Sequence, residues 1–361
     1  MSAEPDSGHR FAEASDAPLL EVADVKTHFR TERGTVRAVD GVSFSLERGK
    51  TLGIVGESGS GKSVLARSIM GLLPGHNVVR AGSIRFEGRE IGDLGPKAMQ
   101  EFWGAQMAMV FQDPMTSLNP VMKIGRQITE SLRYHLDVSK GFASETAEAL
   151  LASVGIPEPK RRLKEYPHQL SGGMRQRVTI AIALACGPKL LFADEPTTAL
   201  DVTVQAQILD LLEQQQRERF MAMILVTHDL GVVAGRADDI AVMYAGKIVE
   251  KAPTRVLFTE MRHPYSEALL NSIPKLADPS HTRLQAIGGR PPDLVRPPPG
   301  CSFAPRCPYA QERCRVEEPP LVEHESEHAY ACWFPVGTRE GEEALRRNRA
   351  ASAAPASAGG S

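Results

Sequence analysis

The stretch Gly56-Glu57-Ser58-Gly59-Ser60-Gly61-Lys62-Ser63 decides how this chain folds. It fits the pattern G-x-x-x-x-G-K-[ST], whose glycines let backbone N–H groups turn inward around phosphate oxygens. The apolar run Leu52–Val55 before it predicts a buried strand, and Val64–Met70 after it predicts a helix whose N-terminus attracts anions. A chance match or an ordinary glycine turn would lack this context. The stretch therefore predicts a nucleoside triphosphate site, with Lys62 at the phosphates and the Ser63 hydroxyl on Mg²⁺.

Length and composition limit the number of domains and the functional classes that fit this chain. The 361 residues suffice for about two or three domains. Charges nearly balance, with 42 Lys and Arg against 44 Asp and Glu, so no overall field would attract nucleic acid. The longest apolar run, Ile180–Cys186, is too short to span a bilayer, and residues 1–18 lack the apolar core of a signal peptide. We therefore expect a cytoplasmic protein.

The order of hydrophobic patterns predicts an α/β fold. Strand-like runs at Lys189–Ala193 and Met221–Thr227 flank a segment with apolar residues at helical spacing, which is the rhythm of a parallel sheet covered by helices. Residues 20–50 and 83–88 predict additional antiparallel strands. Near residue 290 the composition shifts to proline and then cysteine, which indicates the boundary of a small C-terminal module.

A second group of chemistry-bearing residues follows two predicted strands. Asp194 and Glu195 end a buried strand, where the first carboxylate suits Mg²⁺ and the second suits activation of the attacking water. A pair of helix-capping acids before Pro196 is the alternative, and the phosphate loop favours the catalytic interpretation. His228 follows the strand that ends at Thr227 and is placed to contact the γ-phosphate; alone, it would be a cap or a surface residue.

A second glycine-rich turn, Ser171-Gly172-Gly173, opens an apolar helix at Val178–Ala185. Its exposed N–H groups and the Ser171 hydroxyl can bind phosphate, although the turn by itself is also an ordinary helix start. The chain order of all these elements decides between the two. That order resembles the ATP-binding cassette (ABC) ATPase family. The matching elements are the phosphate loop, Gln112 after a strand, Leu170–Gln176, Asp194-Glu195, Ala199-Leu200-Asp201 and His228.

The resemblance covers residues 19–275 and implies the fold of that family. This is an α/β P-loop NTPase core, a parallel sheet with helices, joined to an antiparallel β subdomain and a helical subdomain. Residues 276–336 form a small Cys-rich C-terminal extension, and residues 1–18 and 337–361 are expected to be disordered tails.

The resemblance also implies roles for individual residues. By this resemblance, the nucleotide is held by Gly56–Ser63, Gln112 and Asp194. Phe29 stacks on the adenine, unless Phe29 is simply a core residue of its strand. Mg²⁺ is held by Ser63, Gln112 and Asp194, and the catalytic residues are Glu195, His228 and Lys62. Two such domains dimerise head to tail, so that the signature residues contact the ATP of the partner. The signature residues are Ser171, Gly172, Gly173 and Gln176. Asp201 lies in a neighbouring segment that this family calls the D-loop.

Three runs narrow the resemblance to the oligopeptide/dipeptide importer ATPases, namely Phe111–Pro120, Asp194–Val202 and His263-Pro264-Tyr265. Lys62-Ser63-Val64 and Met115-Thr116-Ser117 look like the first of two non-identical ATPase subunits. The resemblance implies ATP hydrolysis coupled to peptide uptake at the cytoplasmic face of the inner membrane. The partners would be a second ATPase subunit, two transmembrane permease subunits and an extracytoplasmic binding protein. Nickel importers share the pattern, so the cargo stays open.

Four cysteines gather in the Pro-rich extension, which has too few apolar residues to hold a core unaided. They are Cys301, Cys307, Cys314 and Cys332. Four thiolates suit tetrahedral Zn²⁺ or a [4Fe–4S] cluster, and free thiols without a metal are a third alternative. The wide gaps between the cysteines favour the cluster, as does similarity of Gly300–Pro308 to the importer extensions. His324 and His328 are alternative ligands, more simply placed on an acidic surface, and Cys186 is expected to be a buried small hydrophobe.

Other functional classes fit less well. ABC ATPases of DNA repair carry long coiled-coil insertions, whereas only a short helical stretch separates Gln112 from Ser171 here. ABC ATPases that act on the ribosome usually have two cassettes in one chain, whereas this chain has one. It also lacks the excess of basic residues that is typical of nucleic-acid binding. An exporter is disfavoured by the C-terminal extension.

Overall fold

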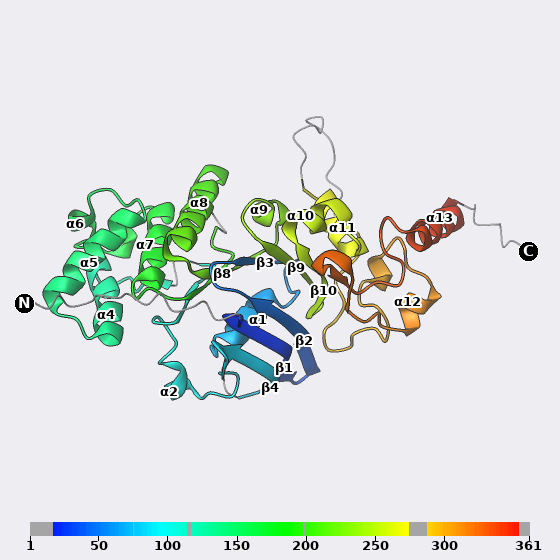
Figure 1. Cartoon of the computed structure of the whole chain (residues 1–361), viewed down its shortest axis with the longest axis horizontal. Coiled ribbons are helices and arrows are strands. Elements are labelled where there is room, and N and C mark those ends of the chain that lie inside the picture. The colour runs from blue at the N-terminus through cyan, green and yellow to red at the C-terminus, as the bar shows by residue number, and fades with distance from the viewer. Residues whose placement is uncertain (1–16, 75, 114–116, 198–199, 274–286, 354–361) are drawn as a thin grey trace, which may run out of the picture.

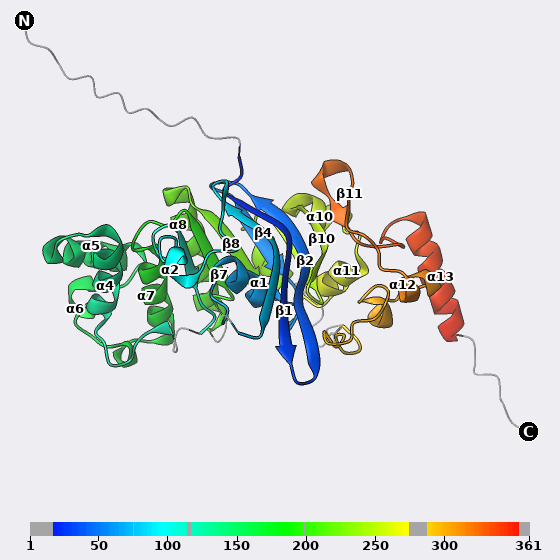
Figure 2. The same cartoon turned by 90° about the horizontal axis from the view of Figure 1, so that it is seen from below.

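The structure is a computed structural model that describes residues 17–74, 76–113, 117–197, 200–273 and 287–353. Parts of two sequence runs used above, Pro114–Thr116 and Thr198-Ala199, lie outside the described residues, as do 1–16 and 354–361. A central sheet separates a group of helices at one end of the long axis from the C-terminal extension at the other (Figures 1 and 2). A smaller antiparallel sheet lies along one face of the central sheet (Figure 1).

The central sheet has the strand order β11-β12-β10-β9-β3-β8-β7-β6. The strands β9, β3, β8, β7 and β6 are parallel neighbours, as the alternating strand and helix patterns predict. Every residue of β3, β7 and β8 is buried, because helices or a second sheet cover both faces. The bounds are β3 Thr51–Val55, β6 Met107–Val110, β7 Leu190–Asp194, β8 Ala222–Thr227, β9 Asp239–Tyr244, β10 Lys247–Pro253, β11 Val322–Glu323 and β12 Ala329–Tyr330.

Two hydrophobic cores lie on the two faces of this sheet. Side chains alternate along β8, so that Met223 and Leu225 join one core while Ile224 and Val226 join the other. The first core packs beneath helices, and the second packs beneath the antiparallel sheet and the helix that follows the phosphate loop. The helices of the cassette core are α1 Lys62–Ile69, α8 Val202–Arg219, α9 Leu230–Val233, α10 Thr254–Glu260 and α11 Pro264–Asn271.

The antiparallel sheet confirms the strands predicted before the phosphate loop and near residue 85. Its order is β2-β1-β4-β5, and all its pairs are antiparallel. The bounds are β1 Leu20–Thr31, β2 Gly34–Leu46, β4 Val78–Phe86 and β5 Arg89–Glu90.

The helical subdomain lies between β6 and β7 in the chain. Helices α4, α5 and α7 contact one another and carry the helical stretch predicted between Gln112 and Ser171 (Figure 1). The bounds are α4 Ile124–Leu136, α5 Lys140–Ser153, α6 Pro159–Arg162, η1 Pro167–Gln169 and α7 Gly172–Leu184, and the short helix α2 Pro96–Met99 comes before β6 in the chain. No helix in the described ranges combines the length and apolar character needed to cross a membrane.

The C-terminal extension continues the central sheet, because β12 pairs with β10 through Glu250 and Tyr330. His328 differs from its expected surface position. It is buried, and its Nε2 lies 2.8 Å from Oε1 of the fully buried Glu250. The bounds in this part are η2 Ala304–Arg306, α12 Glu312–Val316, η3 Glu325–Glu327 and α13 Arg339–Ala353.

Helix α13 lies within the segment 337–361 that the sequence analysis expected to be disordered. Its Ala344 is buried, and Gln311 of the extension donates a hydrogen bond to the side chain of Asn348. The pair Arg339 and Glu343, one helical turn apart, supports the same helix. Packing against the extension therefore orders a segment whose composition alone gives no apolar face.

Candidate nucleotide-binding site

The chemistry-bearing residues of the sequence meet at one edge of the central sheet. The phosphate loop follows β3, Gln112 follows β6, Asp194 and Glu195 end β7, and His228 follows β8. These four strands are parallel neighbours, so their carboxyl ends share an edge, which is where ligands bind in open α/β sheets.

Glycine is required at two positions of the phosphate loop. A Cβ atom on Gly56 would lie 2.2 Å from the carbonyl oxygen of Met243, and one on Gly61 would lie 2.2 Å from that of Ala38. Gly61 also has φ of 103°, in the left-handed region that other residues rarely adopt. The loop therefore follows the backbone of two neighbouring segments closely, and α1 begins directly after it with its free N–H groups.

The Lys62 ammonium lies inside this loop. Its Nζ donates hydrogen bonds to the carbonyl oxygens of Gly56, at 2.7 Å, and Glu57, at 3.0 Å. Only 4% of the side chain is exposed. Burial lowers the pKa of Lys62, and the nearby carboxylates of Glu195, Asp194 and Glu57 act in the opposite direction. Phosphate oxygens would be stronger partners for this ammonium than two carbonyl groups.

Ser63 and Asp194 fit a magnesium site. The Ser63 hydroxyl donates to Oδ1 of Asp194 at 2.8 Å, and Asp194 is fully buried. Its Oδ2 has no hydrogen-bond partner among the described residues. Burial raises the pKa of the Asp194 carboxyl, an effect opposed by the Ser63 hydrogen bond. A buried carboxylate oxygen without a partner beside a hydroxyl is the oxygen-donor environment that Mg²⁺ prefers.

Glu195 stands at the centre of the polar residues. Its Oε2 accepts a hydrogen bond from Gln112 Nε2 at 3.0 Å and lies 3.4 Å from His228 Nδ1. Its Oε1 lies 4.0 Å from Lys62 Nζ. Its backbone has φ of 45°, which is uncommon for a residue other than glycine and is typical of functional sites. The carboxylate is thus oriented by neighbours from three strand ends, as a general base requires.

These side chains line one cavity of about 760 Å³. Its walls come from the phosphate loop, the β-strand ends, α11 and the start of the C-terminal extension. The lining residues are Ala38, Glu57, Ser58, Gly59, Gly61, Lys62, Ser63, Val64, Gln112, Glu195, His228, Leu269, Ser272, Ile287 and Pro291. Phe29 is half-buried on β1 and is not among the described residues that line the cavity, so its stacking on adenine stays a prediction.

The signature residues face elsewhere. Ser171 caps α7 by accepting a hydrogen bond from the Met174 N–H, and both Ser171 and Gly172 are exposed outside the cavity. Asp201 caps α8 in the same way through the Val204 N–H. Exposure of the first turn of α7 suits contact with a second subunit, which stays a prediction. Gln176 is only 1% exposed, and this burial does not fit a direct contact across such an interface.

The C-terminal extension reaches the phosphate loop, a contact that the sequence analysis missed. Both carboxylate oxygens of Glu57 accept hydrogen bonds from the Arg306 guanidinium, at 2.6 and 2.9 Å. Ile287 and Pro291 form part of the cavity wall. The composition shift near residue 290 suggested a separate module, and nothing in the spacing of Glu57 and Arg306 signals their contact.

The four cysteines of the extension line one narrow cavity. Burial raises the pKa of Cys301 to about 11 and of Cys332 to about 12, and it also raises the pKa of Cys307. Across the described ranges, however, no group of three or more His, Cys, Asp or Glu side chains is arranged to hold a metal ion. The structure therefore brings the predicted ligands together but does not support the metal centre itself. Cys186 is half-buried against the core, as a small hydrophobe would be.

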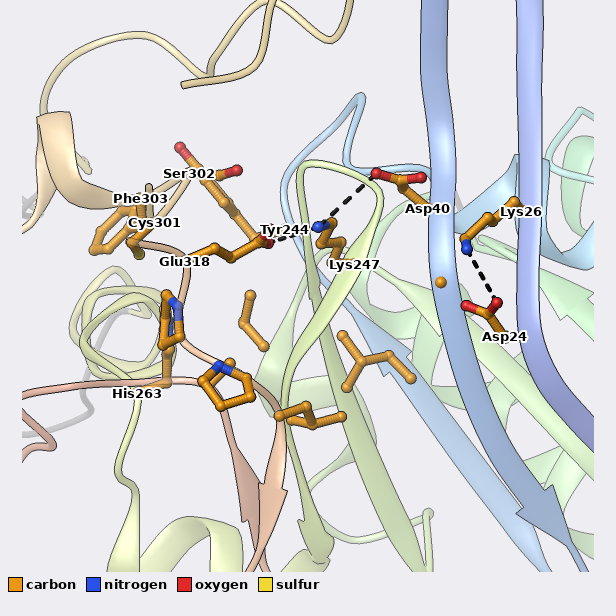
Figure 3. A pocket seen from close by; sticks show the side chains of 17 residues that line it. Asp24, Lys26, Asp40, Tyr244, Lys247, His263, Cys301, Ser302, Phe303 and Glu318 are labelled. Atoms are coloured by element: carbon orange, nitrogen blue, oxygen red, sulfur yellow. Dashed lines mark hydrogen bonds and ion pairs between the residues drawn. The ribbon is translucent and has the colours of Figure 1, made fainter. Parts of the chain in front are cut away.

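A second cavity, of about 470 Å³, lies between the antiparallel sheet, the turn joining β9 and β10, and the extension (Figure 3). Lys247 bridges its two sides, with Nζ 3.8 Å from Asp40 of β2 and 2.6 Å from Glu318 of the extension (Figure 3). None of its described lining residues belongs to the phosphate loop. Its ion pairs instead attach the extension to the cassette core.

Comparisons with known proteins agree with this site. The family described as "ABC transporter" matches residues 39–198, and the family "Oligopeptide/dipeptide transporter, C-terminal region" matches residues 249–314. The chain is 51% identical to the oligopeptide transport ATP-binding protein OppD of Bacillus subtilis, over 88% of each chain. It is 50% identical to the dipeptide transport ATP-binding protein DppD of the same organism, over 88% of this chain and 94% of that one.

A solved structure supports the fold. It is the dimeric post-hydrolysis state of an ATP-binding cassette bound to ADP and phosphate. The match has a TM-score of 0.59 and 26% identity, and it covers 65% of this chain and 99% of the other.

Proposed function

Because the chain belongs to the ABC transporter family, in the branch of oligopeptide and dipeptide transport ATP-binding proteins, we propose that it is the ATP-hydrolysing subunit of a peptide importer. One observation carries this proposal: a site with every catalytic element of an ATPase, in a chain whose C-terminal region matches that of the peptide transporters. The pore would be formed by separate permease subunits.

Hydrolysis follows from the positions of the side chains. Lys62 and the loop N–H groups would bind the β- and γ-phosphates, and Ser63 and Asp194 would hold Mg²⁺, which would supply positive charge against the phosphates. Glu195 accepts a proton from the water whose oxygen attacks the γ-phosphorus, and the products are ADP and phosphate. Gln112 and His228 keep the Glu195 carboxylate oriented towards that water.

The partners follow from the exposed elements and from the relatives. A second ABC ATPase subunit, a paralogue or a copy of this chain, would place its phosphate loop against Ser171 and Gly172. The dimeric state of the solved cassette supports this arrangement. Two permease subunits and an extracytoplasmic binding protein would complete the importer, with this subunit on the cytoplasmic face of the membrane.

Transport assays test the cargo. We expect cells that lack this chain to lose uptake of labelled di- or oligopeptides, and the wild-type chain to restore it. A chain with Glu195→Gln should be produced at the same level and should not restore uptake. Restored uptake of nickel without peptide uptake would contradict the peptide assignment. Co-purification with ribosomes or DNA in place of permeases would contradict the importer assignment altogether.

The cysteines support a further, separate proposal, that the extension holds a [4Fe–4S] cluster with a structural role. Its support is that the four thiols from Cys301 to Cys332 line one narrow cavity. We expect about four iron and four acid-labile sulfide atoms per anaerobically purified chain, lost in Cys307→Ser. One zinc ion without sulfide would replace the cluster by a zinc site, and the absence of both metals would reject a metal centre.

A further inference from the structure

The contact between Arg306 and Glu57 joins two parts of the chain that the sequence separates by 249 positions. Glu57 is the second residue of the phosphate loop and lines the nucleotide cavity. Arg306 lies on η2 of the C-terminal extension, directly before Cys307. The bidentate geometry, with bonds of 2.6 and 2.9 Å, is the strong form of a guanidinium–carboxylate pair.

All five N–H donors of Arg306 have acceptors. Besides the two bonds to Glu57, the guanidinium donates to the Tyr244 hydroxyl at 3.3 Å and to the carbonyl oxygens of Ile287, at 3.1 Å, and Gly288, at 2.8 Å. The Tyr244 and Phe303 rings lie 5.8 Å from its central carbon. Lysine has three donors on a single atom and cannot occupy these positions together.

Burial makes the charge of this pair important. The Arg306 side chain is 2% exposed and the Glu57 side chain is 28% exposed, so water and salt screen the guanidinium side of the pair only weakly. Without Arg306, the Glu57 carboxylate would be an unpaired negative charge on the wall of a cavity that binds phosphates. It would repel the triphosphate and would seek other cations, of which Lys62 is the nearest in the loop.

The same guanidinium fixes the geometry of the cavity wall. It holds the carbonyl groups of Ile287 and Gly288, and Ile287 lines the cavity beside the phosphate loop. On the other side, the Glu57 N–H donates to the Tyr265 hydroxyl at 2.7 Å, so the backbone and the side chain of Glu57 are held independently. Phe303, next to η2, packs against the rings of Tyr244 and Tyr265, which also contact each other.

We propose that Arg306 is a positioning residue of the nucleotide site, through which the C-terminal extension neutralises Glu57 and sets the affinity of the cassette for Mg-nucleotide. The proposal rests on the proposed function, since it concerns the same ATP site. By this proposal the C-terminal extension contributes to nucleotide binding and is not only a separate module.

Nucleotide binding by the purified full-length chain tests this role. The probe is the magnesium complex of adenylyl imidodiphosphate, which is not hydrolysed, titrated by calorimetry. We expect Arg306→Met to weaken binding about tenfold, because it leaves Glu57 unpaired. The double variant Glu57→Gln/Arg306→Met should bind within about threefold of the wild type, since the repelling charge is gone. Arg313→Met is the matched control: this extension arginine also pairs with a glutamate, Glu317, but does not line the cavity.

Rescue by Glu57→Gln distinguishes positioning from a merely structural role, because lost folding of the extension would persist in the double variant. If Arg306→Met does not fold, Glu57→Asp and Glu57→Gln provide the answer with Arg306 intact. The shorter carboxylate keeps the charge but loses reach, so Glu57→Asp should bind more weakly than Glu57→Gln. Wild-type affinity in Arg306→Met, no rescue in the double variant, or tighter binding by Glu57→Asp would each overturn the proposal. Failure of the wild type to bind the probe would instead overturn the proposed function, and this inference with it.

Discussion

Glu195→Gln is expected to lower the rate of ATP hydrolysis by at least about a hundredfold while leaving MgATP binding unchanged. Glutamine has the same shape as glutamate, so the contacts of residue 195 with Gln112 and His228 can be kept. What is lost is the negative oxygen that accepts the proton of the attacking water. Lys62, Ser63 and Asp194, which we propose to hold the nucleotide and its magnesium, are untouched by the substitution.

The measurement compares phosphate release with equilibrium binding for the same preparation. Glu218→Gln, an exposed glutamate on α8, is the matched control and should hydrolyse ATP at the wild-type rate. Normal turnover by Glu195→Gln would remove Glu195 as the base. If both MgATP binding and turnover were lost, the substitution would have disrupted the structure of the site and not only the proton transfer to residue 195.

The sequence predicted the parts of this site that depend on local pattern. The phosphate loop, the carboxylates at the end of β7 and the residues after β6 and β8 lie where the strand and helix rhythm places them. A parallel sheet brings the carboxyl ends of its strands to one edge, so the convergence of Gln112, Glu195 and His228 follows from the fold class. The left-handed backbone of Glu195 could not be predicted, because no side-chain pattern favours it at a glutamate.

Contacts between segments that lie far apart in the chain could not be predicted from the sequence. The pairs Glu57–Arg306 and Glu250–His328 each join the cassette core to the extension, and each residue alone has the charge of an ordinary surface side chain. The pairing of β12 with β10 brings His328 beside the buried Glu250, and a segment rich in proline and cysteine does not indicate that pairing. Helix α13, where composition favoured disorder, packs on the extension through Ala344 and Asn348.

Lys62→Ala is expected to weaken binding of MgATP about a hundredfold, because it removes a charge-assisted hydrogen bond to phosphate in a buried site. The backbone of the loop should survive, since glycines at 56 and 61 shape it and α1 begins regardless of the side chain at 62. In this variant the carbonyl oxygens of Gly56 and Glu57 lose their hydrogen-bond donor, and their partial negative charges face the phosphates. Turnover at saturating ATP should fall as well, because Lys62 lies 4.0 Å from Glu195.

Titration of the full-length chain with MgATP measures this loss directly, with Lys97→Ala, an exposed lysine on α2, as the control that should bind normally. The two substitutions at the site separate its functions. Glu195→Gln removes chemistry and keeps binding, whereas Lys62→Ala removes binding first. Equal affinity of Lys62→Ala and the wild type would mean that the nucleotide is held by the backbone N–H groups and the α1 N-terminus alone. The buried ammonium would then serve the loop and not the phosphates, and the assignment of Lys62 to nucleotide binding would be wrong.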